Sequence, residues 1–455
     1  MTKVLIIIVT WNKKKYVVDL LDSIYKMSSD ETQICILVID NASTDDTVSV
    51  LKEKFPNIHV IENKENLGGT GGFNTGIAWA LEQKENTFDY LWLLDNDVVV
   101  HKQTLFYLIQ TLEKEKHAAI CGSTMMQLDF PWRINEMGAF VDLFRGELNL
   151  HRHLKKIPKL KKKNINQLIK GKIDLSKKLS DCPKYMDVDY VAAASLLIKT
   201  SVAREAGLWD DYFIHFDDVE WCLRISKLGY RVLVSSQSII WHLSAHAKIP
   251  TWILYYDNRN ILYLLEKHSS IERVKKKIFR IKMKAIYFSL IGKNDLAFLH
   301  IQAIQDYRKQ KKGKAEITTA QNTVIANILA DPSIKTILVP STINLFKTNI
   351  HKPLALFAKS SSDIKIDYLR IPGSPSNSIP RAKTIKVSTW RLFRWIKYIQ
   401  QYKKYDAVLQ SDYQIIPALS WLGKKTIFIN NESVTIHPSA SLTKFFSIIR
   451  YTLNT

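Results

Sequence analysis

Two aspartates that directly follow an apolar run have the residue type and spacing of a metal site. The run Tyr90–Leu94 is a predicted buried strand, and Asp95 and Asp97 follow it at positions i and i+2. A hard divalent cation prefers oxygen ligands, and two carboxylates plus diphosphate oxygens make a suitable shell. The cation would offset the charge that builds on a departing diphosphate. Because Asp and Asn are also ordinary turn formers, the pair alone does not separate a metal site from a turn.

A glycine-rich segment upstream supports the first interpretation. Residues 66–76 contain four glycines in five positions and lie between a predicted strand and an apolar helix. Glycine lets backbone N–H groups approach a ligand closely, and a helix N-terminus favours phosphate. The segment is not a dinucleotide fingerprint, because Asn74 stands where the third glycine should be, and it is not a P-loop. We expect Asn66, Gly69 and Gly71 to contact a phosphate-bearing ligand, with a flexible turn as the alternative.

Two adjacent acids begin a predicted helix over Asp217–Leu228. Exposed N–H groups stabilise carboxylates at a helix start, so capping is the alternative role for Asp217. Asp218 can project toward a ligand from the first turn. A carboxylate with a pKa of about 3.9 cannot remove a hydroxyl proton in advance, but it can accept that proton as a new bond forms. Trp221 offers a flat face for a sugar ring or belongs to the core.

A histidine ends the short apolar run Ile239–His242. A single histidine is more often a satisfied structural residue than a ligand. Only the company of Asp95 and Asp97 would make His242 a metal ligand.

The first 120 residues alternate short β-branched runs with longer helical patterns, which predicts βαβ units and a mostly parallel α/β sheet. The expected strands are Val4–Val9, Ile34–Ile39, His59–Ile61 and Tyr90–Leu94. The expected helices lie near Tyr16–Met27, Asp45–Phe55, Phe73–Glu82 and Gln103–Glu115. The polar residues named above follow strand ends, and ligands bind at the carboxyl ends of strands in open α/β sheets.

The rest of the chain predicts an extension and a second unit. A basic insertion at about 145–185 is either a solvated loop or a contact with a membrane or acceptor. We expect a catalytic domain over 1–265, a basic helical extension and linker over 266–330, and a smaller α/β domain over 331–455. The basic helical sequence suits an anionic membrane surface or packing against the core.

Composition limits the partners. The chain has 455 residues and a net charge of +22, which favours an anionic partner such as a nucleotide, a lipid surface or a nucleic acid. Its four cysteines are scattered without zinc or disulfide spacing, so we expect reduced thiols. No apolar run approaches the roughly 20 residues of a spanning helix, and the N-terminus lacks a cleavage site. We expect a cytoplasmic protein that is peripheral on the inner face of the membrane.

In this order, the motifs resemble the family 2 glycosyltransferases of the GT-A fold over about residues 3–265. The matching pieces are Thr10-Trp11-Asn12, Val38–Asp46, the glycine segment, Asp95-Asn96-Asp97, Asp217-Asp218 and Trp241-His242. The resemblance implies an α/β GT-A domain with a Rossmann-like mixed sheet and a nucleotide-sugar donor. It also implies that Thr10, Asp40 and Asn41 contact the base and ribose, with Asn12 and Asn96 beside them. It makes Asp95, Asp97 and His242 ligands of Mn²⁺ or Mg²⁺, and Asp218 the general base.

Within the family, three segments look most like the galactofuranosyltransferases, and related rhamnosyltransferases share much of the pattern. They are Asn66–Phe73, Asp217–Glu220 and Tyr255–Asn260. The resemblance implies a UDP-sugar donor, with UDP-galactofuranose favoured over dTDP-rhamnose, and a glycan or lipid-linked acceptor. Tyr255 and Arg259 resemble residues near the donor phosphates or the acceptor, and Asp217 and Trp221 are further acceptor candidates. Helix packing is the alternative for Tyr255 and Arg259.

The tail from about Thr336 is weakly similar to the N-terminal half of a GT-B glycosyltransferase. The donor-binding half of such enzymes is absent from this sequence, so no activity is assigned to the tail. The expected reaction is a one-step, inverting displacement. The rivals are a nucleotidyltransferase, which would release pyrophosphate, and a basic nucleic-acid-binding protein, although no recognised nucleic-acid module is present.

Overall fold

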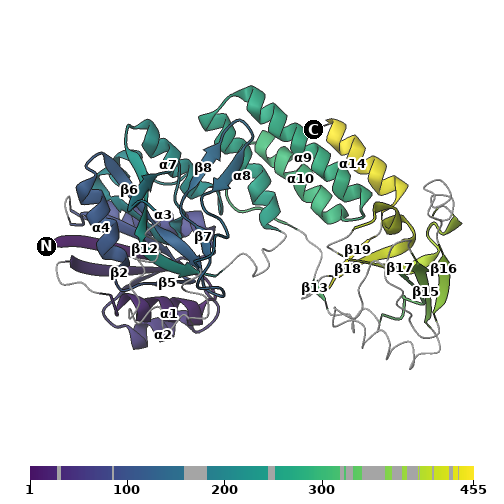
Figure 1. Cartoon of the computed structure of the whole chain (residues 1–455), viewed down its shortest axis with the longest axis horizontal. Helices are drawn as coiled ribbons and strands as arrows, with labels where there is room; N and C mark the ends of the chain where they lie inside the picture. Colours follow the sequence, from purple (N-terminus) through teal and green to yellow (C-terminus); the bar gives the residue numbers. More distant parts are fainter. Residues whose placement is uncertain are drawn as a thin grey trace. The chain divides into compact units, whose positions relative to one another are not determined.

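A computed structural model shows two compact units in the chain (Figure 1). The first unit comprises 1–250, 259–277 and 309–315, and the second comprises 251–258, 278–308 and 316–455. The residues that the structure describes are 1–27, 32–84, 87–157, 182–243, 252–317, 322–323, 331–340, 364–370, 382–386, 398, 400–411, 415–429, 434–438 and 440–454. Residues 158–181 of the expected basic insertion lie outside them.

The first unit is built on one mixed sheet with the strand order β10-β12-β6-β11-β4-β1-β2-β3. Strands β4, β1, β2 and β3 run parallel, β11 is antiparallel to both of its neighbours, and β12 is parallel to β6. Strand bounds are β1 Thr2–Thr10, β2 Thr32–Asp40, β3 His59–Glu62, β4 Tyr90–Asp95, β5 Val98–Val100, β6 Ala118–Gln127, β7 Ile134–Glu136, β10 Tyr185–Asp187, β11 Leu196–Lys199 and β12 Arg231–His242. A separate hairpin joins β8 Ala139–Asp142 and β9 Glu147–Leu150. The expected α/β class and mixed sheet are confirmed.

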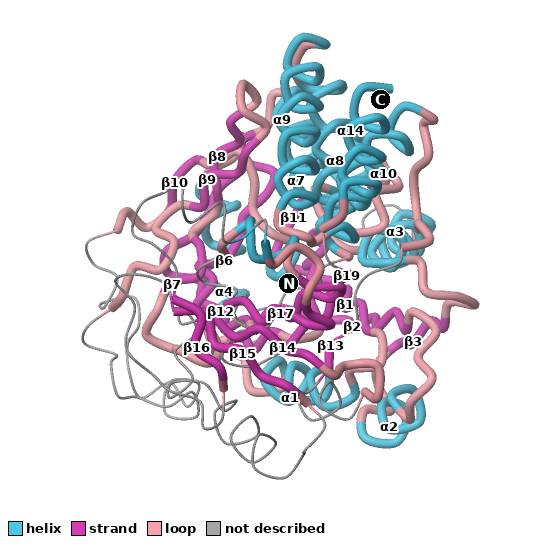
Figure 2. The backbone as a smooth tube through the Cα atoms, turned by 90° about the vertical axis from the view of Figure 1, so that its right-hand side faces the viewer, coloured by secondary structure: helices cyan, strands magenta, loops and turns pink. Residues whose placement is uncertain are grey.

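Helices cover both faces of this sheet. They are α1 Lys14–Ile24, α2 Thr47–Lys54, α3 Gly68–Glu82, α4 Thr104–Lys114, α6 Thr200–Ala206 and α7 Asp217–Lys227. Figures 1 and 2 both show α1 and α2 on one side of β1 and β2, with α3 on the other side. Side chains alternate along a strand, so each face of β1 contributes to a different layer.

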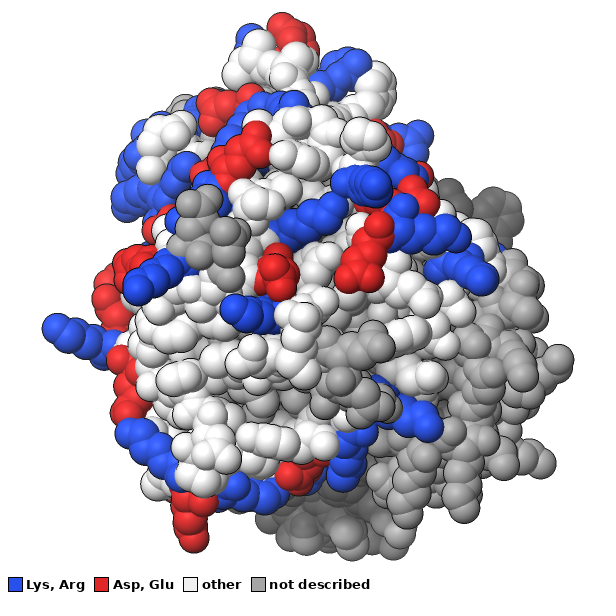
Figure 3. Space-filling model, turned by 90° about the vertical axis from the view of Figure 1, so that its left-hand side faces the viewer, with Lys and Arg blue, Asp and Glu red and all other residues white. Residues whose placement is uncertain are grey.

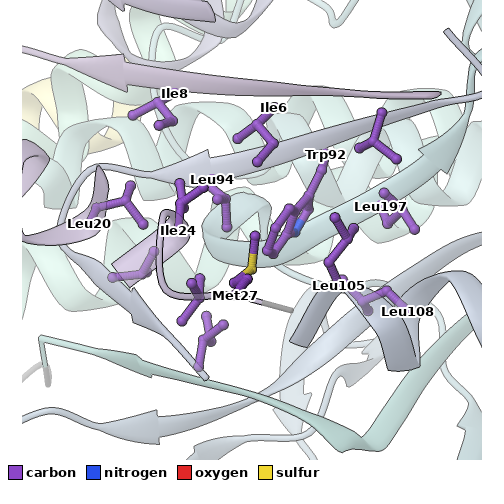
Figure 4. Packing of buried hydrophobic residues seen from close by; sticks show 14 of the residues in the cluster. Ile6, Ile8, Leu20, Ile24, Met27, Trp92, Leu94, Leu105, Leu108 and Leu197 are labelled. Atoms are coloured by element: carbon purple, nitrogen blue, oxygen red, sulfur yellow. The ribbon is translucent and has the colours of Figure 1, made fainter. Parts of the chain in front are cut away.

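One layer of the core lies between the sheet and helices α1 and α4 (Figure 4). Ile6 and Ile8 of β1 point into it beside Trp92 and Leu94 of β4. The Trp92 indole N–H donates to the Ser195 hydroxyl at 3.0 Å, which satisfies its polar atom inside the core. Burial of these large apolar side chains fixes the register of β1 and β4, and with it the position of the residues that follow them.

The opposite layer explains why glycines occur inside a helix. Helix α3 begins at Gly68, five residues earlier than the expected start at Phe73. A Cβ added to Gly72 would lie 2.4 Å from Val9 Cγ1, and one added to Gly76 would lie 2.4 Å from Ile7 Cγ2. The missing side chains therefore let α3 pack very closely on β1, and this packing outweighs the low helix propensity of glycine.

The second unit contains a sheet in the order β13-β19-β18-β17-β14-β15-β16. Its strands are β13 Asn322–Thr323, β14 Thr336–Pro340, β15 Lys365–Arg370, β16 Lys383–Lys386, β17 Tyr405–Ser411, β18 Gly423–Ile429 and β19 Val434–Pro438. The five strands from β16 to β18 run parallel, and β19 is antiparallel to β18. The sequence of this region predicts strands at Thr336–Val339, Ala407–Gln410 and Thr426–Ile429, and these lie within β14, β17 and β18.

The helical region does not form a separate extension. It consists of α8 Ile253–His268, α9 Ile271–Leu290 and α10 Asn294–Arg308, and α14 Leu442–Asn454 follows the second sheet. Ala285 of α9 packs with Ala297 and Ile301 of α10 and with Ile448 of α14, so these helices share a core within the second unit. Residues 259–277 belong to the first unit, which moves its boundary beyond the expected residue 265. Among the described helices, none combines the length and apolar character needed to cross a bilayer.

Candidate active site

The strand pairing brings the expected metal ligands together. Asp95 is the last residue of β4, and Asp97 immediately precedes β5. Strand β5 pairs with β12 so that His242 lies opposite Val98, next to Asp97. His242 Nε2 is 3.1 Å from Asp97 Oδ1 and 3.8 Å from Asp95 Oδ2. One ligand atom from each of the three residues fits within a 4.8 Å span, which suits a single divalent cation.

Electrostatics show that this triad needs positive charge. Burial, and then the charge of Asp97, raises the pKa of Asp95 to about 6. Burial opposes ionisation of Asp97 as well, but the hydrogen bond and charge of His242 outweigh it and lower the pKa of Asp97. Burial would lower the pKa of His242, yet the two aspartates raise it to about 9. The two carboxylates could therefore hold a cation, and His242 would bind that cation as a neutral imidazole.

Two hydrogen bonds join the start of α3 to the start of α7 and the loop before it. The Thr70 N–H donates to the Phe213 carbonyl at 3.1 Å, and the Thr70 hydroxyl donates to Asp217 Oδ2 at 2.6 Å. Gly68 has φ +73°, and a Cβ there would lie 2.1 Å from the Phe213 oxygen. Phe213, His215 and Phe216 also have positive φ angles of 68°, 65° and 67°. Non-glycine residues in this region cost energy and cluster at functional sites.

Asp218 follows Asp217 in the first turn of α7 and accepts two backbone hydrogen bonds. Its carboxylate oxygens accept from the Ala193 N–H at 3.1 Å and from the Val219 N–H at 2.8 Å. Burial, and then the charge of Asp217, raises the pKa of Asp218 to about 8. The charge of Asp217 also contributes to the raised pKa of Asp95. Since the charge of Asp217 acts on Asp95, the start of α7 lies near the triad in the first unit.

A further acid that the sequence did not single out joins the cluster. Glu136 is the last residue of β7, is 7% exposed, and pairs with Met125 of β6. Burial raises its pKa to about 7, and the charge of His242 opposes that shift. The charge of Glu136 in turn raises the pKa of Asp218. A glutamate on the buried face of a short strand was the available signal, because Ile134 two residues earlier shares that face.

The nucleotide side of the site forms where β1 and β2 end together. Thr10 pairs with Asp40 in the parallel register, and the Asn96 side-chain N–H donates to the Thr10 hydroxyl at 3.0 Å. Asp40 Oδ2 accepts from the Ser43 N–H at 2.9 Å. Its other oxygen, Oδ1, is buried and has no hydrogen-bond partner within the described part of the chain. A buried acceptor without a donor is costly, so Asp40 is suited to bind a donor group of a ligand.

Three expected nucleotide contacts serve mainly to shape the loops. The Asn41 side chain donates to the Gly68 carbonyl at 2.8 Å and accepts from the Leu67 N–H at 3.2 Å. Asn66 Oδ1 accepts from the Gly68 N–H at 2.8 Å. Asn12 has φ +50°, and its Oδ1 accepts from the Thr44 N–H at 2.7 Å. These amides position the strand ends and the start of α3.

A second residue that the sequence missed lies next to Asn12. Trp11 follows β1 directly and is 49% exposed. The apolar residues Val4–Ile8 of β1 are buried, whereas the Trp11 ring beyond the strand end is about half exposed and can stack on a flat ligand.

Three acceptor candidates are corrected by the structure. Trp221 is fully buried, and its indole N–H donates to the Gly207 carbonyl at 2.9 Å. Tyr255 is fully buried in the second unit, where its hydroxyl donates to Asp306 Oδ2 at 2.8 Å. Arg259 is 1% exposed and donates to the Tyr212 carbonyl at 2.9 Å. None of the three presents surface to an acceptor, so the packing alternative holds.

Asp217 is corrected for a related reason. It is 6% exposed and accepts the hydrogen bond of Thr70, so it anchors the helix start instead of contacting an acceptor. Asn260 supports the same segment, because its side-chain N–H group donates to the carbonyls of Tyr212, Ile214 and His215 at 3.1, 2.8 and 3.0 Å.

Comparison with known proteins finds sequence similarity to glycosyltransferases. Residues 5–173 match the glycosyl transferase family 2 domain. The chain is 24% identical over 210 residues to galactofuranosyltransferase GlfT2 of Mycobacterium tuberculosis, covering 46% of this chain and 32% of that protein. It is 33% identical over 108 residues to the poly(ribitol-phosphate) beta-N-acetylglucosaminyltransferase TarS of Staphylococcus aureus, covering 23% of this chain and 18% of that protein. The crystal structure of S. aureus TarS 1-349 shares 18% identity over 67% of this chain and 80% of that chain, with a TM-score of 0.42.

Residues 5–173 of the chain therefore contain a family 2 glycosyltransferase domain, as the motifs predicted. It spans about a third or less of the length of the curated relatives named above.

Proposed function

We propose that the chain is an inverting, metal-dependent glycosyltransferase that uses a nucleotide-sugar donor. The observation that carries this proposal is that the Asp95, Asp97 and His242 triad lies close to the Asp217-Asp218 pair at the start of α7, in a unit that contains the family 2 match. When bound by the triad, Mn²⁺ or Mg²⁺ supplies positive charge for the leaving nucleoside diphosphate. The described residues fit such an ion in number, type and span.

Other residues of the chain bind the nucleotide and its phosphates. Asp40, with its unpartnered buried oxygen, binds a donor group of the nucleotide, and the exposed ring of Trp11 stacks on the base. The N-terminus of α3 presents Gly69 and Gly71 toward phosphate, since a helix start favours negative charge.

Asp218 acts as the general base. Its pKa of about 8 is well above that of an ordinary carboxylate. Asp218 is therefore a stronger base, better suited to accept the proton of a hydroxyl group. In the productive state it is ionised, stabilised by the two backbone N–H groups that it accepts from. It takes the acceptor proton as the hydroxyl attacks the anomeric carbon from the side opposite the leaving group, so the product has inverted configuration.

For the donor we favour UDP-galactofuranose, with dTDP-rhamnose as the alternative, and for the acceptor a glycan or lipid-linked glycan of a surface polysaccharide. The similarity to GlfT2 supports the first choice, and the similarity to TarS adds UDP-N-acetylglucosamine to the donors to be tested. We place the reaction on the cytoplasmic face of the membrane.

The test is incubation of the full chain with a panel of nucleotide sugars and Mn²⁺, with detection of released nucleoside diphosphate. We expect slow hydrolysis of one donor. A chelator should abolish this hydrolysis, and added Mn²⁺ should restore it. Release of pyrophosphate would identify a nucleotidyltransferase instead, and hydrolysis that is unaffected by the chelator would remove the metal role.

The rival class, a nucleic-acid-binding protein, has weaker support. Despite the net charge of +22, Lys and Arg side chains on the face shown in Figure 3 alternate with acidic ones and with wide uncharged areas. Nucleic-acid binding by a charge-driven surface would fall steeply with salt, whereas donor hydrolysis would change little.

A further inference from the structure

Helix α9 carries an outer face that the packing of the second unit leaves uncovered. Within the second unit, Ile281, Ala285 and Ser289 form its inner face and are buried. The inner face therefore already supplies the helix with its core contacts.

The outer face is apolar where a solvated helix should be polar. Phe279, Met283 and Tyr287 are 64%, 48% and 49% exposed and recur every four residues, so they form one ridge along the helix. An exposed apolar ridge on a helix that also has a buried face marks an interaction surface. We call Phe279, Met283 and Tyr287 the α9 ridge.

Basic residues border this ridge. Lys275, Lys276 and Lys284 are exposed, and Lys282 is half-buried. The helix contains seven basic residues and a single acidic one, Glu272, in its first turn. Lysine stems can lie along an apolar surface while their ammonium groups reach polar headgroups. Aromatic and apolar residues along one stripe with lysines beside it are typical of helices that lie in a bilayer interface.

We propose that the α9 ridge and its bordering lysines dock the protein on a bilayer that contains anionic phospholipids. Phe279 and Met283 insert among the acyl chains near the headgroups, Tyr287 sits at the polar boundary, and the lysines pair with lipid phosphates. Charge selects this occupant, because a protein partner for a ridge bordered by lysines would need a matching acidic rim, whereas an anionic membrane offers negative charge everywhere. The surface concerns location and stands apart from the transfer reaction.

The test is flotation of the full-length protein with vesicles of phosphatidylcholine alone or mixed with phosphatidylglycerol. We expect the protein to float with the mixed vesicles and to be released by high salt. Two triple variants probe the two components: Phe279→Gln with Met283→Gln and Tyr287→Gln, and Lys275→Gln with Lys276→Gln and Lys284→Gln. Each should weaken partitioning by about tenfold or more.

Two controls match these changes in kind. Phe106→Gln removes an aromatic side chain of α4 that is 49% exposed, and it should leave flotation unchanged. Lys26→Gln, Lys64→Gln and Lys116→Gln remove the same charge as the lysine variant from exposed positions of the first unit, and the loss should be several-fold smaller. Circular dichroism and donor hydrolysis in detergent-free buffer should be unchanged in the ridge variant, which separates this proposal from the transferase.

Two results would overturn the proposal. One is flotation of the ridge variant at the wild-type level. The other is that the wild-type protein binds neither kind of vesicle and forms a dimer, whereas the ridge variant is a monomer. The α9 ridge would then be an interface between two copies of the chain.

Discussion

Asp218 combines two opposing properties in one carboxyl group. Two backbone N–H groups stabilise its charged form, while burial and the neighbouring Asp217 disfavour it. Because the negative charge of Asp218 is disfavoured, the group readily accepts a proton during the reaction. The same charge lowers the stability of the folded protein. Such a residue should therefore separate activity from stability when it is changed.

Replacement of Asp218 by Asn should abolish transfer and change how the stability of the protein depends on pH. Loss of the base should lower turnover by about 100-fold or more, with donor binding nearly intact. A raised folded-state pKa means that the carboxyl group contributes stability at low pH, which is lost as pH rises past the ordinary value toward about 8. Asn has a single acceptor oxygen and gives up one of the two backbone hydrogen bonds, so at pH 4 the variant should be slightly less stable than wild type. Between pH 4 and pH 8 the stability difference should move in favour of the variant by about 1 to 3 kcal/mol. Turnover near the wild-type rate would refute the base assignment.

Glu136 offers a second test at this scale, through the pH profile. The charge of Glu136 raises the pKa of Asp218, so removing that charge should lower the pKa of Asp218. Because only ionised Asp218 is active, the rate of the wild-type enzyme should rise with pH through this pKa, and in Glu136→Gln the rise should shift to lower pH. Glu113→Gln on α4, a helix outside the active site, is the matched control. An unshifted profile in Glu136→Gln would show that the two carboxyl groups are not coupled.

At the scale of elements, the strands were predicted well because they are short, continuous apolar runs that are buried on both faces of the sheet. The expected runs Val4–Val9 and Tyr90–Leu94 lie within β1 and β4. The start of α3 was placed too late because the low helix propensity of glycine is a local property. The reason for Gly72 and Gly76 in the helix is non-local: they allow close contact with β1.

The same limit explains the site residues that sequence reasoning placed wrongly. The grouping of Asp95, Asp97 and His242 could be predicted because these residues lie at or just after strand ends in recognisable motifs. Residue type did not show that Trp221 and Arg259 are enclosed and hydrogen-bonded, since aromatic and cationic side chains also suit exposed sites. Glu136 was missed because β7 is three residues long and pairs with β6 at only two positions.

A pair of glycine substitutions tests the packing of α3. In Gly72→Ala the new methyl group would meet Val9 at 2.4 Å and push the helix from β1, which should cost about 1 to 3 kcal/mol. Gly69→Ala is the control, because nothing lies within 4 Å of its added Cβ and alanine favours the helix. Chemical denaturation should show a loss of stability for the first variant and none for the second. Equal effects would mean that close packing is not the reason for Gly72.

At the scale of the whole molecule, the first unit is not contiguous in sequence. After α10 the chain returns to it through residues 309–315. There the Gly313 N–H donates to the Asp211 carbonyl at 2.9 Å, and the Gly313 carbonyl accepts from Arg259 at 2.9 Å. Near the end of α8, Lys267 and His268 contact the buried carboxylate of Glu220 at 2.8 and 3.2 Å. These contacts hold the segment that leads into the acidic pair.

Shortening the chain should therefore reveal where the catalytic unit ends. A 1–265 fragment loses Lys267, His268 and Gly313, and the buried charge of Glu220 then keeps only Arg224 as a partner. Loss of partners of a buried charge costs about 3 to 5 kcal/mol, which is a large part of the stability of an ordinary domain. We expect this fragment to fail to bind UDP in calorimetry, whereas a 1–317 fragment binds it, although the latter exposes apolar surface at Ala297 and Ile301 and is less soluble. If the 1–265 fragment unfolded at the same temperature as the 1–317 fragment, the returning segment would have no structural role in the first unit.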